Sequence, residues 1–284
     1  MNHFYNNRIN RSFDMSREAR RTRLVDIFKD TVAMMKAPDL QESIKFSQAY
    51  TKMYILQNES FNRPEFTRQM EVSVTNHRTF EAAVLIHEKF PDKRIGVLNF
   101  ASATNPGGGV ESGSSAQEES LCRCSTLYPA LDRKELLEKY YDFHRNRHNP
   151  LYTDRCIYTP GIQIIKTDTD YPERLNPSQY ISVDVITCAA PNLRHAEDVS
   201  NEKLEQLHLS RGRRILNVAV ENKIDCLVLG AFGCGAFRND PHVVAQAYAK
   251  LMKEFKGAFD LVEFAVFYWG KEITNYQAFK DVLG

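Results

Sequence analysis

Short, nearly continuous apolar segments alternate with segments of helical periodicity along this chain, and that alternation most constrains its fold. Six segments have the length and character of strands: "EVSVT" (71–75), "RIGVLNFAS" (94–102), "CIYTPGIQII" (156–165, a strand or hairpin), "YISVDVITCAA" (180–190), "CLVLG" (226–230) and "LVEFAVFYW" (261–269). Strands that are apolar on both faces are typical of a sheet covered by helices on each side. The pattern therefore predicts an α/β/α sandwich.

Helical spacing of apolar residues predicts the elements between these strands. Ser16 is placed to cap the first helix, and the others are expected at 76–90, 115–128 (where Pro129 interrupts), 131–147, 201–222 and from Asp240. Residues 37–70 are polar, with several possible helical turns. We expect residues 1–70 to form a helical extension packed on one core domain, 71–284.

The charge balance excludes a large electrostatic field around the protein. The 284 residues have a formal net charge of +1, with 43% hydrophobic and 26% charged residues, as is ordinary for a globular chain. The first 23 residues contain six arginines against Asp14 and Glu18, which is most simply a solvated arm and helix face. Sequence-specific binding to nucleic acid is not expected.

Cysteine spacing argues against disulfides and a zinc site, and no bound cofactor is expected. The six cysteines include no C-x-x-C pair and no pairing with histidine at zinc spacing, and several lie in apolar runs. No apolar run approaches the ~18 residues that span a bilayer, and the first residues lack the apolar region of a signal peptide. We expect a cytoplasmic monomer without metal or membrane contact.

A glycine loop follows the second apolar strand, in "NPGGGVESGSSAQEES" (105–120). Ligands of open α/β sheets bind beyond the carboxyl ends of strands, and glycines let a backbone approach them closely. Ser115 and Glu118 fit a capping box that would start the next helix, so Glu118 has a purely structural alternative. Glu119 lies about 100° further round that helix and points elsewhere. The structural alternative to a functional role for Glu119 is that it is a solvated acid in the first helical turn.

A second glycine-rich turn, in "LVLGAFGCGAFRNDP" (227–241), links another predicted strand to a helix that would begin at Asp240 and Pro241. Such turns present several N–H groups to a phosphate, although a tight structural turn explains the glycines equally well. The spacing matches neither a P-loop nor a dinucleotide fingerprint. Phe232 and Phe237 flank the glycines and could stack on a ligand or pack the turn. One loop bears acids and the other bears none. This difference indicates that the acid-free loop holds a phosphate and that the acid-bearing loop carries out chemistry near a sugar.

The run of three glycines, seven residues and Gln-Glu-Glu resembles the signature of poly(ADP-ribose) glycohydrolases, enzymes built on a macrodomain. The segments "VLNFASATNPGGG", "CIYTPGIQII", "VITCAAPN" and "LGAFGCGAFRNDP" are similar to the microbial-type branch, so the resemblance extends over roughly residues 70–270. It implies a macrodomain-like α/β/α sandwich and binding of ADP-ribose and poly(ADP-ribose), including polymer on modified proteins.

The resemblance also implies roles for individual residues. Glu119 would be the catalytic carboxyl, Glu118 would hold a ribose hydroxyl, and Gln117 would help shape the loop. The diphosphate and distal ribose would lie along Gly107, Gly108 and Gly109. The residues of the second loop would cradle the diphosphate, with Phe237 against the distal ribose: Gly233, Cys234, Gly235, Ala236 and Phe237. An asparagine before the glycines positions the ribose in the family's animal branch, and Asn105 and Ser102 compete for that position.

The implied reaction is hydrolysis of ribose–ribose O-glycosidic bonds. Its oxocarbenium-like transition state needs a proton donor and then a base, and one carboxyl can serve as both in turn. Adjacent helical acids cannot flank the bond from opposite sides, so Glu119 is expected to act alone. The alternatives are a hydrolase of mono-ADP-ribosylated targets and a non-catalytic ADP-ribose-binding macrodomain. Asp184, an acid inside an apolar strand, could read adenine or be a paired acid at a strand edge.

Overall fold

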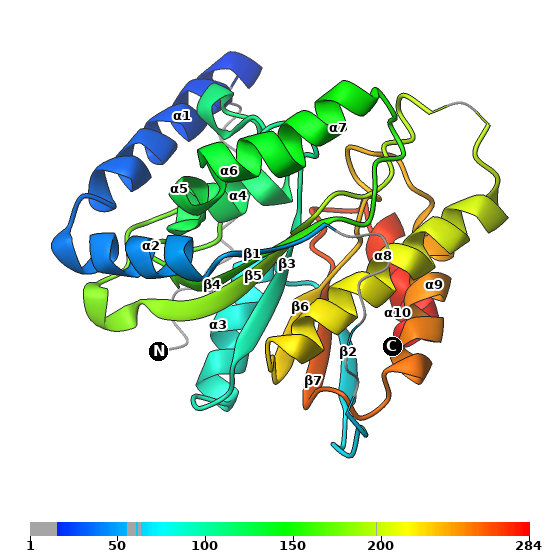
Figure 1. Ribbon diagram of the computed structural model, residues 1–284. Helices are drawn as coiled ribbons and strands as arrows, with labels where there is room; N and C mark the ends of the chain where they lie inside the picture. Colours follow the sequence, from blue (N-terminus) through cyan, green and yellow to red (C-terminus); the bar gives the residue numbers. More distant parts are fainter. Residues whose placement is uncertain (1–15, 56–60, 62–63, 197) are drawn as a thin grey trace.

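A seven-stranded mixed sheet forms the centre of the molecule (Figure 1). The computed structural model describes residues 16–55, 61, 64–196 and 198–284. The strand order is β1-β4-β5-β3-β6-β7-β2. The strands are β1 (Lys52–Tyr54), β2 (Glu71–Thr75), β3 (Ile95–Phe100), β4 (Cys156–Ile164), β5 (Ile181–Cys188), β6 (Cys226–Leu229) and β7 (Leu261–Ala265). All six predicted strand segments are therefore confirmed.

Five neighbouring strands, β5, β3, β6, β7 and β2, run parallel, so their carboxyl ends meet at one edge of the sheet. The connections between them contain helices, as parallel pairing requires. The β4 strand joins β5 in antiparallel orientation, with a register shift between Thr159 and Ile162. Segment 156–164 is thus a strand of the main sheet.

The β1 strand was not predicted. Lys52–Tyr54 lies within the region expected to be a helical cover, yet it pairs with Cys156–Tyr158 and extends the sheet by one edge strand. Three residues are too few to show the period-2 alternation that identifies a strand in a sequence. Pairing with β4, about 100 residues later, decides their conformation.

Helices cover both faces of the sheet. They are α1 (Arg17–Met34), α2 (Pro38–Tyr50), α3 (Thr79–Lys89), α4 (Gln117–Cys124), α5 (Leu127–Leu131), α6 (Lys134–Leu136), α7 (Asp142–Arg147), α8 (Asn201–Glu221), α9 (Pro241–Glu254) and α10 (Thr274–Leu283). Shorter turns are η1 (Val110–Ser112), the π-helical turn η2 (Leu137–Tyr141) and η3 (Pro177–Gln179).

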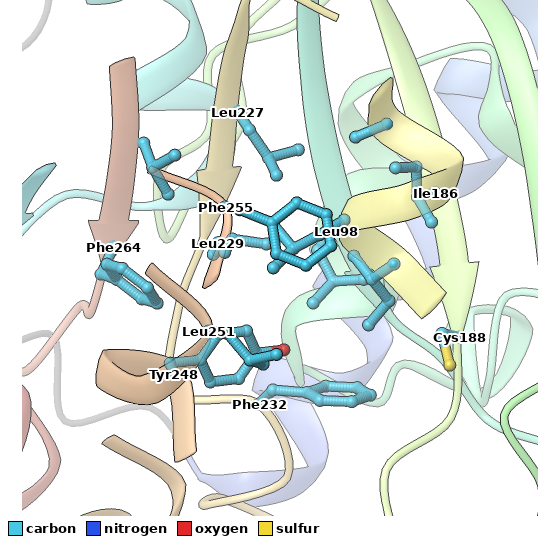
Figure 2. Close-up of a cluster of buried hydrophobic side chains, with 14 of the residues drawn as sticks. Leu98, Ile186, Cys188, Leu227, Leu229, Phe232, Tyr248, Leu251, Phe255 and Phe264 are labelled. Atoms are coloured by element: carbon cyan, nitrogen blue, oxygen red, sulfur yellow. The ribbon is translucent and has the colours of Figure 1, made fainter. Parts of the chain in front are cut away.

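The core has two layers because successive strand residues point to opposite faces. Leu98 packs with α8, α9 and α10, while its neighbour Val97 packs with α1, α3, α4 and α5. Figure 2 shows the first layer, where Leu98, Ile186 and Leu227 of the sheet meet Phe255 beyond α9. The predicted α/β/α sandwich is confirmed.

Helix boundaries differ from expectation at several places: the helix expected over 76–90 begins at Thr79, and the one expected over 115–128 begins at Gln117 and ends early. Pro129 lies inside α5, and the helix preceding it ends instead at Cys124. Ser125 forms an isolated bridge with Ile164, and its hydroxyl accepts from the Leu127 N–H, so a tertiary pairing breaks the helix before the proline. The predicted caps at Ser16 and Asp240 are confirmed, since both side chains accept from the first turn of their helices. None of the described helices is both long enough and apolar enough to cross a membrane.

A buried cation attaches α1 to the core. Lys166 is 1% exposed, and its ammonium donates to the Ile27 carbonyl oxygen (2.8 Å) and pairs with the Asp30 carboxylate (2.9 Å). Burial lowers the pKa of Lys166, and Asp30 opposes that change. The Arg174 and Lys166 side chains in turn hold the pKa of Asp30 well below its usual range. The N-terminal helix is therefore bound to the core by charge as well as by apolar contact.

Replacing Asp30 by alanine should destabilise the protein, because it leaves the Lys166 ammonium buried without its counter-charge. We expect a loss of about 1–3 kcal/mol, below the roughly 3–5 kcal/mol of a fully buried pair because water reaches Asp30. Urea unfolding followed by circular dichroism measures this. Glu135→Ala, which removes an exposed i,i+4 pair with Lys139, is the matched control and should change little. Equal effects of the two substitutions would contradict the interpretation.

Candidate active site

A cavity of about 570 Å³ lies at the carboxyl ends of the parallel strands. The segments that follow β2, β3, β5, β6 and β7 all contribute to its wall, and the first turn of α4 supplies two of its acids, Glu118 and Glu119. The lining residues include His77, Arg78, Thr79, Phe100, Ser102, Thr104, Gly108, Gln117, Glu118, Glu119, Tyr152, Asp168, Asn192, Phe232, Gly233, Gly235, Ala236, Phe237, Phe267 and Asn275. Both predicted glycine loops thus reach one cavity.

Gln117 fixes the start of α4 against the end of β3. Its amide oxygen accepts from the Phe100 N–H (2.9 Å), and its amide nitrogen donates to the Leu98 carbonyl oxygen (2.8 Å) and the Thr79 hydroxyl (3.0 Å). One side chain therefore satisfies two backbone groups of the strand from which the loop departs. The two acids that follow are placed relative to the sheet by this contact.

Glu118 is buried beneath the loop. Its carboxylate accepts from the Ser102 N–H (2.7 Å) and from the Asn99 amide nitrogen (3.2 Å). Burial raises its pKa to about 8, although these two hydrogen bonds oppose the change. The expected capping box is wrong: α4 begins at Gln117 after Ala116, without a side-chain cap, and Glu118 is held by β3 and its loop. Tertiary hydrogen bonds replace the local one.

Glu119 has one oriented and one unpartnered oxygen. Oε1 accepts from the Gly109 N–H at 2.9 Å, while Oε2 is buried with no hydrogen-bond partner in the described part of the chain. The other lining carboxylates use both oxygens, Glu118 as above and Asp168 with the Phe80 N–H and the Ser120 hydroxyl. Glu119 is therefore the lining carboxylate with one oxygen that no group among the described residues occupies.

The first glycine loop packs directly on these acids. Gly107 and Gly108 have φ angles of +68° and +61°, a region that side chains disfavour. A Cβ on Gly108 would lie 2.5 Å from Glu119 Oε1 and 3.1 Å from Glu118 Oε2. Gly108 lines the cavity, whereas Gly107 packs behind it against Tyr128 and Gly109 supplies the N–H to Glu119. The loop needs glycine because the acids occupy the space of a side chain.

The second loop presents unused donors to the cavity. The backbone N–H groups of Gly233, Gly235, Ala236 and Phe237 have no acceptor among the described residues, and all four residues line the cavity. A Cβ on Gly235 would have no atom within 4 Å. The Cys234 side chain does not join the lining and packs with the apolar core. This arrangement of free N–H groups suits an anion.

The two candidates for the position before the glycines are placed differently. Asn105 is exposed, contacts Thr104 and Arg145, and does not line the cavity. Ser102 does line it and donates its N–H to Glu118. The structure therefore brings Ser102, and not Asn105, to the acids.

Sequence reasoning missed Asn99, which reaches Glu118 from within β3. The available signal was a polar residue inside an otherwise apolar strand. The same signal marks Asp184, but this acid lies near the start of β3, away from the cavity, and bonds Arg94 (2.5 Å), Tyr158 (2.6 Å) and the Gly161 N–H (3.0 Å). The paired-acid interpretation of Asp184 is confirmed.

Arg78 was also missed. It is the one arginine or lysine among the described lining residues, paired with Asp170 (2.6 Å) and placed over the Phe267 ring (4.0 Å to the centroid). No group of three or more potential metal ligands occurs among the residues that the structure describes.

Comparison with known proteins identifies the family. The family model described as microbial-type PARG, catalytic domain, matches residues 22–167. The chain belongs to the microbial-type poly(ADP-ribose) glycohydrolases. No curated protein gives a match.

Solved structures of bacterial poly(ADP-ribose) glycohydrolases are similar over most of the chain. The Thermomonospora curvata enzyme is 30% identical with a TM-score of 0.83, covering 93% of this chain and 100% of that one. Its complex with the inhibitor ADP-HPD is also 30% identical (TM-score 0.79, covering 92% and 99%). The Deinococcus radiodurans enzyme in complex with ADP-ribose is 37% identical (TM-score 0.75, covering 84% and 96%). The family match extends into residues 22–70, the expected extension.

Glu118 should make stability depend on pH. Because its pKa rises from 4.5 to about 8, the folded protein holds an extra proton between these values, and stability falls as pH rises through this window. Glu118→Gln cannot ionise, and Asn99 can rotate its unpartnered Oδ1 towards the new amide. The melting temperature of Glu118→Gln relative to wild type should therefore increase from pH 6 to pH 9 in thermal unfolding. Glu111→Gln, an exposed acid of η1, is the control. A constant difference across this range would refute the assignment.

Proposed function

We propose that this protein hydrolyses the ribose–ribose O-glycosidic bonds of poly(ADP-ribose) and releases ADP-ribose, with Glu119 as proton donor and then general base. The observation that carries the proposal is the unpartnered Glu119 Oε2 in a cavity whose opposite loop offers free N–H groups. Membership of the microbial-type family supports the same activity. The Deinococcus radiodurans relative was solved in complex with ADP-ribose, which has both a diphosphate and a terminal ribose.

The size of the cavity and the order of the groups along it suit ADP-ribose. Its volume of about 570 Å³ lies within the usual range for small-molecule sites. We place the diphosphate on the N–H groups of Gly233–Phe237, so the terminal ribose lies against Glu118 and Glu119. The nucleoside then occupies the end lined by Arg78, Phe267 and Asn275. Phe237, which lies 6.2 Å from the Tyr152 ring, would pack against the distal ribose.

The hydrogen bond from Gly109 to Oε1 orients the Glu119 carboxyl so that Oε2 meets the glycosidic oxygen. Glu119 first donates its proton to that oxygen as the bond to the ribose anomeric carbon breaks. The resulting carboxylate then takes a proton from water, and the hydroxide adds to the anomeric carbon. One proton leaves and one returns, so Glu119 is regenerated.

Glu118 has a different role in this proposal. Its carboxyl is already held by Asn99 and Ser102, and its raised pKa keeps it protonated near neutral pH. A protonated carboxyl can donate to a ribose hydroxyl and thus fix the sugar beside Glu119.

Three properties remain predictions made from the sequence. They are action on polymer carried by modified proteins, a cytoplasmic location and a monomeric state.

Glu119→Gln should abolish turnover and leave ADP-ribose affinity within a few-fold of wild type, because glutamine can still accept from Gly109 but cannot transfer the proton. We expect a loss of roughly 10²–10⁴-fold, as for other general acid–base groups. Thin-layer analysis of products from labelled poly(ADP-ribose), with calorimetry for binding, measures both quantities. Glu111→Gln is the control acid on the same loop.

Near wild-type turnover by Glu119→Gln would eliminate the mechanism. Binding of ADP-ribose without turnover by the wild-type protein would indicate a non-catalytic binding domain. Faster release from mono-ADP-ribosylated protein than from polymer, in a side-by-side assay, would assign the other substrate class.

Gly235→Ala tests where the diphosphate lies. The added methyl group meets no protein atom within 4 Å, so the melting temperature should not change. It would, however, project towards a ligand held by the neighbouring N–H groups, and calorimetry should show several-fold weaker binding of ADP-ribose. Unchanged affinity for ADP-ribose would show that the diphosphate does not lie on this loop.

A further inference from the structure

The loop between β6 and α9 has little local support for its conformation. Its own backbone hydrogen bonds include two short turns, Cys234 N–H to the Ala231 carbonyl oxygen (3.1 Å) and Arg238 N–H to the Gly235 carbonyl oxygen (3.0 Å), and one closing bond from the Asn239 N–H to the Gly233 carbonyl oxygen (3.0 Å). Two of its residues, Gly233 (φ +82°) and Arg238 (φ +59°), occupy the left-handed region. Something outside these turns must hold the loop for its free N–H groups to keep one arrangement.

The Leu193 N–H, which donates to the Phe237 carbonyl oxygen (3.0 Å), and the Asn239 side chain supply that support. Asn239 is 2% exposed and does not line the cavity. Its amide nitrogen lies within hydrogen-bond distance of three carbonyl oxygens, those of Pro191 (2.7 Å), Gly233 (3.1 Å) and Phe237 (3.2 Å). The Gly233 and Phe237 carbonyls lie at the two ends of the loop, and the Pro191 carbonyl belongs to the segment after β5. One amide therefore connects two of the segments that line the cavity.

This contact also affects the electrostatics of the cavity. A carbonyl oxygen that accepts from the buried Asn239 amide is directed away from a ligand. The Gly233 and Phe237 carbonyls, whose partial negative charges would repel a diphosphate, are held by this amide together with the backbone N–H groups of Asn239 and Leu193. The N–H groups of the loop that lack an acceptor among the described residues then suit an anion.

His208 of α8 and the three carbonyl oxygens together fix which way the Asn239 amide faces. Its Nε2 lies 2.7 Å from Asn239 Oδ1, and its ring is fully buried. Burial lowers the His208 pKa to about 4, so the ring is neutral near pH 7. An amide oxygen only accepts, so Nε2 carries the proton and Oδ1 faces the histidine. The opposite orientation would direct Oδ1 at three carbonyl oxygens.

We propose that Asn239 and His208 are positioning residues for ADP-ribose, which hold the Gly233–Phe237 loop in its anion-binding arrangement without touching the ligand. The proposal rests on the proposed function for the identity of the ligand. It adds two residues outside the cavity lining to the group on which binding depends. The His208 ring also lies edge-on to Phe232 (5.9 Å between centroids), which does line the cavity.

Asn239→Asp and His208→Leu test this proposal. The first places an acceptor against three carbonyl oxygens, and the second removes the donor that orients the amide. For the folded protein we expect each to raise KM and the ADP-ribose Kd by roughly 10- to 100-fold, the size typical of losing a buried hydrogen bond or misplacing a binding group. The kcat value at saturating polymer should stay within a few-fold. His208→Gln, which retains a donor, should recover part of the affinity.

Asn222→Asp is the matched control. Asn222 is also buried, caps the far end of α8, and donates its amide to Tyr54 and the Val218 carbonyl oxygen. It should lower the melting temperature and leave KM and Kd unchanged. Wild-type affinity in folded Asn239→Asp and His208→Leu would overturn the inference. Absence of ADP-ribose binding by the wild-type protein would instead refute the proposed function, so the two failures are distinguishable.

Discussion

The hydrogen bond from the Gly109 N–H to Glu119 Oε1 is the contact on which the site depends. It exists because Gly108, the residue before, approaches the first turn of α4 more closely than a residue with a side chain could. The same approach buries Glu118 beneath the loop and raises its pKa. One backbone feature thereby gives two adjacent acids different environments. One acid has a free oxygen and the other is held on both oxygens.

The elements around this contact keep α4 in place. Gln117 binds it to the end of β3, and the Thr31 hydroxyl of α1 donates to the Arg123 carbonyl oxygen at 2.6 Å. The α1 helix is in turn held by the buried Lys166 through Asp30. The N-terminal helix therefore contributes to the stability of the acid-bearing helix. Across the cavity, Asn239 and His208 hold the acid-free loop, Gly233–Phe237, in place by hydrogen bonds from outside the cavity lining.

Much of the fold could be predicted because its signals are local. Continuous apolar strands, the caps at Ser16 and Asp240 and the two glycine loops all follow from neighbouring residues. The errors occurred where a distant partner decides a conformation. The Lys52–Tyr54 strand depends on β4, the helix break before Pro129 depends on Ile164, and Ser115 does not cap α4 because β3 holds Glu118 instead.

By itself, the sequence determined the α/β/α class, the family resemblance and the acids and glycines of the two loops, because spacing along one segment carries that information. Only the tertiary structure decided which oxygen of which acid remains free, that Ser102 and not Asn105 reaches the acids, and that Asn99, Asn239 and His208 support the cavity. The physical reason is that burial and hydrogen bonding depend on neighbours in space. These neighbours come from strands and helices far apart in the chain.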